Sequence, residues 1–220
     1  AQNDYSKALD YFKKSLKLDL SFFGENHPSV ASGYYNIGYV YFAQGDYSKA
    51  LEYFEEVLKI RLSVYGENHS RVASVYNDIG EIYSVQGDDF KALDYFKKSL
   101  KIVLSVYGEN HSQVSSIYDH IGEIYFAQKD YSKALYYFEE SLKIRLSLFG
   151  ENHPEVALSY YSIGSLYIIQ GDKSKALNYY EKSLKIRLSV YGENHPLTKE
   201  IMDLINVANS KVLQLSLIHI

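Results

Sequence analysis

A single spacing constrains what this chain can fold into. The tetrapeptide Gly-Glu-Asn-His occurs five times, and its glycines Gly24, Gly66, Gly108, Gly150 and Gly192 stand 42 residues apart. The sequence between them recurs as well, as in AQGDYSKALEYF at 43–54 and AQKDYSKALYYF at 127–138. A fixed period of roughly 20–50 residues is typical of repeat architectures, in which each unit packs mainly on its neighbours. The repeat is therefore the unit to interpret.

One repeat, from Pro28 to Gly66, carries two helical patterns. Apolar residues first follow the three-and-four spacing of a helix face, at Tyr34, Ile37, Gly38 and Tyr41. The segment QGDY at 44–47 interrupts them with residues that stop one helix and cap the next. A second run then places Ala50, Leu51, Phe54, Leu58 and Leu62 on one face before Gly66 ends it. Each repeat is predicted to be a helical hairpin.

The whole chain is predicted to form one continuous array over residues 1–220. Residues 1–23 match the second helix of a truncated repeat, so we expect a fragment of a longer protein. Four full repeats follow at 28–66, 70–108, 112–150 and 154–192. Residues 196–215 are predicted to form a C-terminal capping helix, in which Asn206 and Asn209 replace the repeated glycine and tyrosine. The tail LSLIHI at 215–220 matches no repeat position; it is either a non-native end or the apolar end of the cap.

These residues resemble a known family. The pattern Tyr34-x2-Ile37-Gly38-x2-Tyr41, followed by Ala50-x3-Phe54, is similar to the tetratricopeptide repeat, and it returns in the three later repeats. The period of 42 and the G-x-x-H-P linker resemble the kinesin light chain-like and nephrocystin-like subclass. The resemblance implies an all-α fold, a right-handed α-solenoid of antiparallel helix pairs with a concave groove. A glycine in mid-helix costs about 1 kcal/mol relative to alanine, so Gly38 and its copies are expected where another helix comes very close.

The five recurring histidines are interpreted as structural. Two histidines one repeat apart cannot both come within about 2.0–2.1 Å of one zinc ion, because neighbouring helix axes alone lie about 8–10 Å apart. Five equivalent general bases fit no enzyme, and no phosphate loop, nucleophile motif or cysteine is present. We expect each glycine to end a second helix, and Asn26 or His27 to cap the next first helix, with Pro28 in its first turn. Glu155, three residues after Asn152, suggests a capping box in one copy. No enzyme activity, cofactor or metal is expected.

Composition excludes other partners. The formal net charge of −4 gives no basic footprint for nucleic acid, and no apolar run approaches the roughly 20 residues that span a bilayer. The chain has no cysteine, which permits a reducing compartment, and a cytoplasmic location is expected. No small-molecule substrate is expected either.

The candidate site is the free face of each first helix, which lines the groove in the family. Its members vary between repeats, and the predicted groove residues are Tyr35, Asn36, Tyr39, Asn77, Asp78, Glu81, Asp119, His120, Glu123 and Tyr161. None of the 23 lysines and arginines falls at these positions, and basic residues such as Lys49, Lys59 and Arg61 are expected on the opposite, convex side. Acidic residues at the centre with aromatic residues around them predict a basic partner with an apolar anchor.

Two functions follow from this interpretation. The first is a non-enzymatic scaffold that binds a peptide or partner segment in the groove. The second is a regulatory or self-associating segment attached to a catalytic or nucleotide-binding domain outside this chain.

Overall fold

The computed structural model describes residues 2–217, with side chains for residues 4–210, and this part of the chain contains ten α-helices and no strand. The helices are α1 (Gln2–Phe23), α2 (Pro28–Ala43), α3 (Tyr47–Tyr65), α4 (Ser70–Val85), α5 (Asp89–Tyr107), α6 (Ser112–Ala127), α7 (Tyr131–Phe149), α8 (Pro154–Gln170), α9 (Lys173–Tyr191) and α10 (Pro196–Leu217). The predicted all-α class is confirmed, and none of the described helices is long and apolar enough to cross a membrane. The tail at 215–220 lies outside the residues whose side chains are described.

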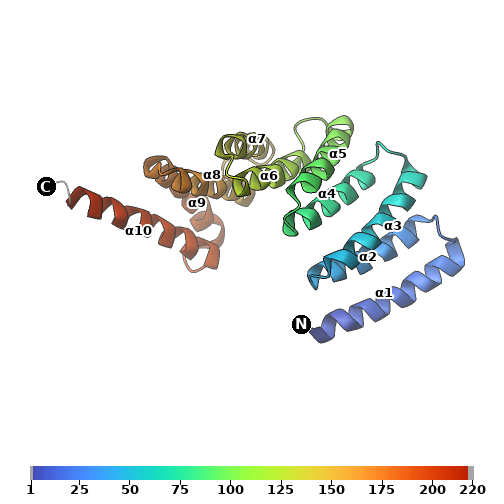
Figure 1. Ribbon diagram of the computed structural model, residues 1–220. Helices are drawn as coiled ribbons and strands as arrows, with labels where there is room; N and C mark the ends of the chain where they lie inside the picture. Colours follow the sequence, from blue (N-terminus) through green and yellow to red (C-terminus); the bar gives the residue numbers. More distant parts are fainter. Residues whose placement is uncertain (1, 218–220) are drawn as a thin grey trace. The chain divides into compact units, whose positions relative to one another are not determined.

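The helices divide into two compact units, an N-terminal unit of residues Ala1–Gly108 and a C-terminal unit of residues Glu109–Ile220. Within each unit, consecutive helices lie side by side in chain order, as the blue-to-green and the green-to-red ribbons show (Figure 1). The helices pair as hairpins: α2 with α3 and α4 with α5 in the first unit, α6 with α7 and α8 with α9 in the second. Within a unit, hairpins that pack on one another in chain order form an α-solenoid.

Each linker histidine caps the helix that follows it. Nδ1 of His27 accepts the backbone N–H of Ser29 at 3.1 Å, and His69, His111, His153 and His195 repeat the bond at 3.1–3.2 Å. The ring of His27 also stacks on Phe23 at the end of the preceding helix, with centroids 4.3 Å apart. The histidines are therefore structural, as predicted, and His27 rather than Asn26 is the cap. His153 caps α8, so the capping box predicted from Asn152 and Glu155 is wrong.

The second helices begin and end with equally regular chemistry. Asp46 caps α3 by accepting the backbone N–H of Lys49, and Asp88, Asp130 and Asp172 do the same for their helices. Gly66 ends α3 with φ +78°, a backbone conformation that residues other than glycine rarely adopt. Lys129 stands where the other repeats have glycine before the aspartate cap, and it holds φ +63°.

The mid-helix glycines mark close contacts between the two helices of a hairpin. A Cβ atom added to Gly80 of α4 would lie 2.8 Å from Cε1 of Phe96 on α5, and one added to Gly122 would lie 2.7 Å from Phe138. Gly164 meets Tyr180 in the same way at 2.7 Å. The predicted close approach is confirmed, and it explains why these helices tolerate a residue with poor helix propensity.

Tyrosines form a second repeated contact. Tyr41 on α2 stacks on Tyr53 on α3 with ring centroids 5.5 Å apart, and the pairs in the three later repeats have centroids 5.6–5.7 Å apart. The Lys49 ammonium lies over the Tyr41 ring, 5.1 Å from its centroid. Stacking of this kind fixes the two helices of each hairpin along their sides as well as through their buried faces.

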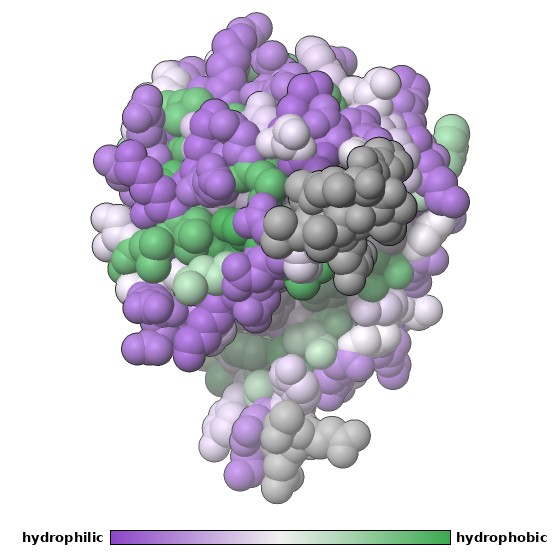
Figure 2. Space-filling model, turned by 90° about the vertical axis from the view of Figure 1, so that its left-hand side faces the viewer, coloured by the Kyte–Doolittle hydropathy of each residue, from purple (hydrophilic) through white to green (hydrophobic). Residues whose placement is uncertain are grey.

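The outermost helices differ from the others. On α1, Tyr11 is 71% exposed, although its counterparts such as Tyr53 are held between tyrosines of a first helix. On α10, Asn206 and Asn209 are exposed, and the capping role of this helix stays a prediction. On the side of the molecule in Figure 2, hydrophilic residues predominate and hydrophobic ones gather in separate patches between them.

Candidate peptide-binding face

The predicted site residues lie on four first helices in two groups. In the N-terminal unit, α2 carries Tyr35, Asn36 and Tyr39, and α4 carries Asn77, Asp78 and Glu81; in the C-terminal unit, α6 carries Asp119, His120 and Glu123, and α8 carries Tyr161. We call these ten positions the A-face. Only Asn36, Tyr39 and Glu123 are exposed, and the other seven side chains are half-buried. Much of the A-face therefore contacts other helices of its unit.

In the N-terminal unit, Asp78 lies among groups from three helices. Burial raises the pKa of its carboxyl to about 7, and the charge of Glu81 adds to this; a hydrogen bond from Tyr35 and the charge of Arg61 oppose it. Burial, and to a smaller extent the charge of Asp78, raises the pKa of Tyr35 to about 12. Oδ2 of Asp78 is buried and has no hydrogen-bond partner among the described residues. The carboxyl is thus poorly compensated by the protein itself.

Asn77 and Glu81 form a pair one helical turn apart on α4. Nδ2 of Asn77 donates to Oε1 of Glu81 at 2.7 Å, and Oδ1 of Asn77 is buried without a hydrogen-bond partner in the described part of the chain. Burial raises the pKa of Glu81, and the bond from Asn77 opposes the shift.

In the C-terminal unit, Asp119 is compensated by an arginine. A guanidinium nitrogen of Arg145 on α7 lies 2.7 Å from Oδ2 of Asp119 and 3.0 Å from Oε2 of Glu155, and Nη1 donates to Ser159 at 2.8 Å. Only 5% of the Arg145 side chain is exposed. Burial raises the pKa of Asp119, and Arg145 is the largest opposing cause. Asp119 therefore adds less negative charge to the A-face than its sequence position alone indicates.

His120 and Glu123 occupy the same helix. Burial lowers the pKa of His120; the charge of Glu123 raises it and that of Arg145 lowers it further. The imidazole is therefore more easily neutral than an exposed one, and it adds no strong positive charge to the A-face.

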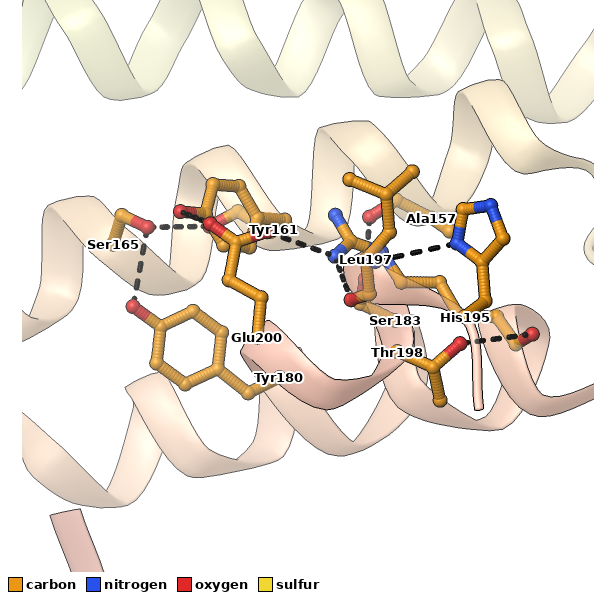
Figure 3. A network of polar contacts seen from close by, with 10 residues as sticks. Ala157, Tyr161, Ser165, Tyr180, Ser183, His195, Leu197, Thr198 and Glu200 are labelled. Carbon is orange, nitrogen blue, oxygen red and sulfur yellow. Dashed lines mark hydrogen bonds and ion pairs between the residues drawn. The ribbon is translucent and has the colours of Figure 1, made fainter. Parts of the chain in front are cut away.

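Tyr161 belongs to a network that joins α8, α9 and α10. Its hydroxyl donates to Oε1 of Glu200 at 3.1 Å, and its ring faces the guanidinium of Arg187, whose carbon lies 5.0 Å from the centroid. Arg187 also donates to the carbonyl oxygen of Leu197 at 2.6 Å. Figure 3 shows the Tyr161–Glu200 contact beside two other hydroxyl bonds: a partly buried one between Ser165 and Tyr180, and a buried one from Ser183 to the Ala157 carbonyl.

The arginines are the residues that the sequence-based assignment missed. Arg61, Arg145 and Arg187 occupy one position of the 42-residue repeat, and Val103 occupies it in the remaining full repeat. Arg61 was expected on the convex side with the lysines, but it is half-buried and donates to the Arg71 carbonyl and to Ser74 of α4. The sequence did carry a signal for these arginines, because a charged residue recurs at one repeat position on the buried face of the second helix.

Pockets of about 240–340 Å³ recur where a linker Glu-Asn meets its hairpin, as at Glu25, Asn26, Tyr34 and Lys59. No group of three or more histidine, aspartate or glutamate side chains in this part of the chain is arranged to hold a metal ion.

The architecture defines a helical-repeat protein of the kind that carries binding surfaces on stacked hairpins. The family model of the tetratricopeptide repeat matches residues 1–63, 29–105, 71–147 and 113–189. The chain therefore belongs to the tetratricopeptide repeat family. Among curated proteins, none matches the sequence.

Solved structures with the same fold include kinesin light chain-like proteins, which confirms the predicted resemblance. BtubC (BKLC) from P. vanneervenii aligns with a TM-score of 0.77 and 25% identity over 89% of this chain and 77% of that one. A putative kinesin light chain from Podosopora anserina, with nearly identical TPR-like repeats, aligns with a TM-score of 0.71 and 16% identity over 86% and 90% of the two chains. The apo form of RapI aligns with a TM-score of 0.71 and 18% identity over 84% and 64%.

Proposed function

We propose that this chain is a non-enzymatic scaffold and that its A-face holds a peptide or a partner segment. The observation that carries this proposal is the contrast between two faces of the same helices. The buried face repeats Gly38, Gly80, Gly122 and Gly164, whereas the A-face varies between repeats. Packing explains the first set in full, but the exposed A-face side chains Asn36, Tyr39 and Glu123 only in part. Tetratricopeptide scaffolds bind protein partners through such surfaces.

The proposed partner carries a positive charge and an apolar anchor. Support comes from the N-terminal unit, where Tyr39 is 57% exposed and lines a pocket with Asp78, whose Oδ2 is buried without a hydrogen-bond partner among the described residues. Aromatic side chains are common binding anchors, and complementary charge speeds encounter and selects the partner. The C-terminal unit supports this charge preference less, because Arg145 pairs with Asp119 there.

The experiment is a selection of displayed peptides against the purified chain, followed by fluorescence polarisation with matched basic and acidic peptides. Tyr39→Ala should weaken binding of the selected peptides. Phe90→Ala should leave binding unchanged, because Phe90 is an 84% exposed aromatic residue on α5, outside the A-face. Binding of basic peptides should also weaken with salt, since the Debye length falls from about 10 Å at 0.1 M to about 3 Å at 1 M.

Equal losses in the two variants, or acidic peptides that bind as well as basic ones, would contradict the proposal. The cytoplasmic location remains part of this proposal and is tested by fractionating cells that express the tagged chain.

A further inference from the structure

We propose that a pocket in the N-terminal unit binds the ammonium group of a lysine side chain. The pocket has a volume of about 20 Å³ and is lined by Tyr39 and Phe42 of α2, Phe54 of α3, and Asp78 and Glu81 of α4. This inference rests on the proposed function, because the lysine would belong to the peptide on the A-face.

The lining matches a cation in two ways. Two carboxyl side chains meet three aromatic rings in one small space, and an ammonium group is attracted both to carboxylates and to ring faces. Oδ2 of Asp78 is buried and has no hydrogen-bond donor among the described residues, so a donor from a ligand would satisfy it. Burial raises the pKa of the Asp78 carboxyl, so an ammonium group beside it would favour the ionised carboxylate.

Arg61, whose charge acts on Asp78, directs its hydrogen bonds to other groups. Arg61 directs its Nη1 to the Arg71 carbonyl at 2.7 Å and to Ser74 at 2.9 Å, and its guanidinium faces the ring of Tyr35. Its charge lowers the pKa of Asp78, but these side-chain hydrogen bonds of Arg61 go to groups other than that carboxylate.

The size of the pocket selects lysine over arginine. A site needs about 10–15 Å³ to hold one water molecule, and an ammonium group is of similar size. A planar guanidinium with five N–H donors is larger and needs a wider slot. The exposed ring of Tyr39 lies at the pocket and offers an apolar surface to the methylene stem of a lysine.

The test uses n-butylammonium chloride as the lysine side-chain analogue, titrated into the full chain and followed by NMR. For a ligand of so few atoms we expect a dissociation constant of about 1–10 mM, with saturable shifts at Tyr39, Asp78 and Glu81. 1-Butanol in matched sodium chloride and n-butylguanidinium should each bind at least about tenfold more weakly.

Two variants and one control keep the test decisive. Asp78→Asn should reduce n-butylammonium binding at least about tenfold, and Tyr39→Ser, at an exposed position, should weaken it without affecting folding. Asp94→Asn is the matched control, because Asp94 on α5 pairs with Lys98 at the surface. Absence of saturable shifts up to about 100 mM, or equal binding of 1-butanol, would overturn the proposal.

The outcome can be separated from that of the proposed function. If selected peptides lose affinity in Tyr39→Ala but not when their lysines are replaced by norleucine, the A-face binds peptides and the ammonium pocket is wrong. If n-butylammonium binds as expected but selected peptides map elsewhere, the pocket stands and the proposed function is wrong.

Discussion

The guanidinium of Arg145 lies 2.7 Å from the carboxylate of Asp119, and the pair joins the second helix of one hairpin to its first helix. The same guanidinium reaches Glu155 and Ser159 on α8, in the next hairpin. One buried side chain therefore connects three helices of the C-terminal unit.

Arg145→Met should destabilise the chain strongly. Removal of one partner from a buried ion pair leaves the other charge uncompensated, which typically costs about 3–5 kcal/mol. The measurement is urea unfolding followed by circular dichroism. Lys143→Met on the same helix is the control, because Lys143 is largely exposed and pairs with Glu140 at 3.7 Å. Similar unfolding midpoints for the two variants would show that the Arg145 contacts contribute little.

Gly80→Leu should be far more damaging than Glu81→Leu at the next position. A Cβ atom added at residue 80 would lie only 2.8 Å from the ring of Phe96, and overpacking of a core costs about 1–3 kcal/mol or more. Thermal melts of the two variants decide the matter. Equal melting temperatures would mean that α4 and α5 separate more easily than their packing indicates.

The stability of the chain should depend on pH through Asp78. Its pKa is about 7 in the folded chain, against about 3.9 for an unfolded aspartate, so the folded state binds more protons between these values. Stability from this group is therefore present at about pH 4 and is lost as the pH rises to about 7.

Asp78→Asn removes that dependence and should raise the urea midpoint at neutral pH relative to the wild type. Asp119 also has a raised pKa and titrates in both proteins, so the difference between the two curves reports Asp78 together with its charge interaction with Glu81. Parallel curves would show that the Asp78 carboxyl is better solvated than its burial implies.

The histidine caps predict a graded series at His69. His69→Ala removes the acceptor for the Arg71 N–H and should cost about 0.5–2 kcal/mol, as other cap deletions do. His69→Asn restores a capping acceptor but not the stacked ring on Tyr65, so its stability should fall between the wild type and His69→Ala. Elemental analysis supplies the complementary check: stoichiometric zinc lost in His69→Ala would contradict a purely structural role.

Much of the fold could be predicted because each sequence pattern occurs several times along the chain. The spacing of Tyr34, Ile37 and Gly38 indicates a helix face, and the recurrence of the linker histidines identifies helix starts. The division of residues 1–220 into a truncated repeat, four full repeats and a cap stays a prediction, as does the list of A-face residues that bind a partner.

The electrostatics of the A-face could not be predicted in the same way. Helical geometry places Asp78 and Asp119 on one face, but burial and partners depend on side chains from other helices. Arg145 is 26 residues from Asp119 in sequence and reaches it only because α6 and α7 pack together. The periodicity of a single helix shows which way a side chain points. It does not show that an arginine on the neighbouring helix is long enough to reach that side chain.

The arginine contacts also limit how freely segments of this chain can be exchanged. Arg61 and Arg187 each bind a backbone carbonyl at the start of the following helix, at Arg71 and Leu197, so α3 and α9 should be interchangeable modules in a chimera. Replacing α7 by α5 would instead bring Val103 to the place of Arg145 and leave Asp119 without its cation. The 42-residue repeats have similar sequences, yet recombination between them must preserve pairs of residues that belong to different helices.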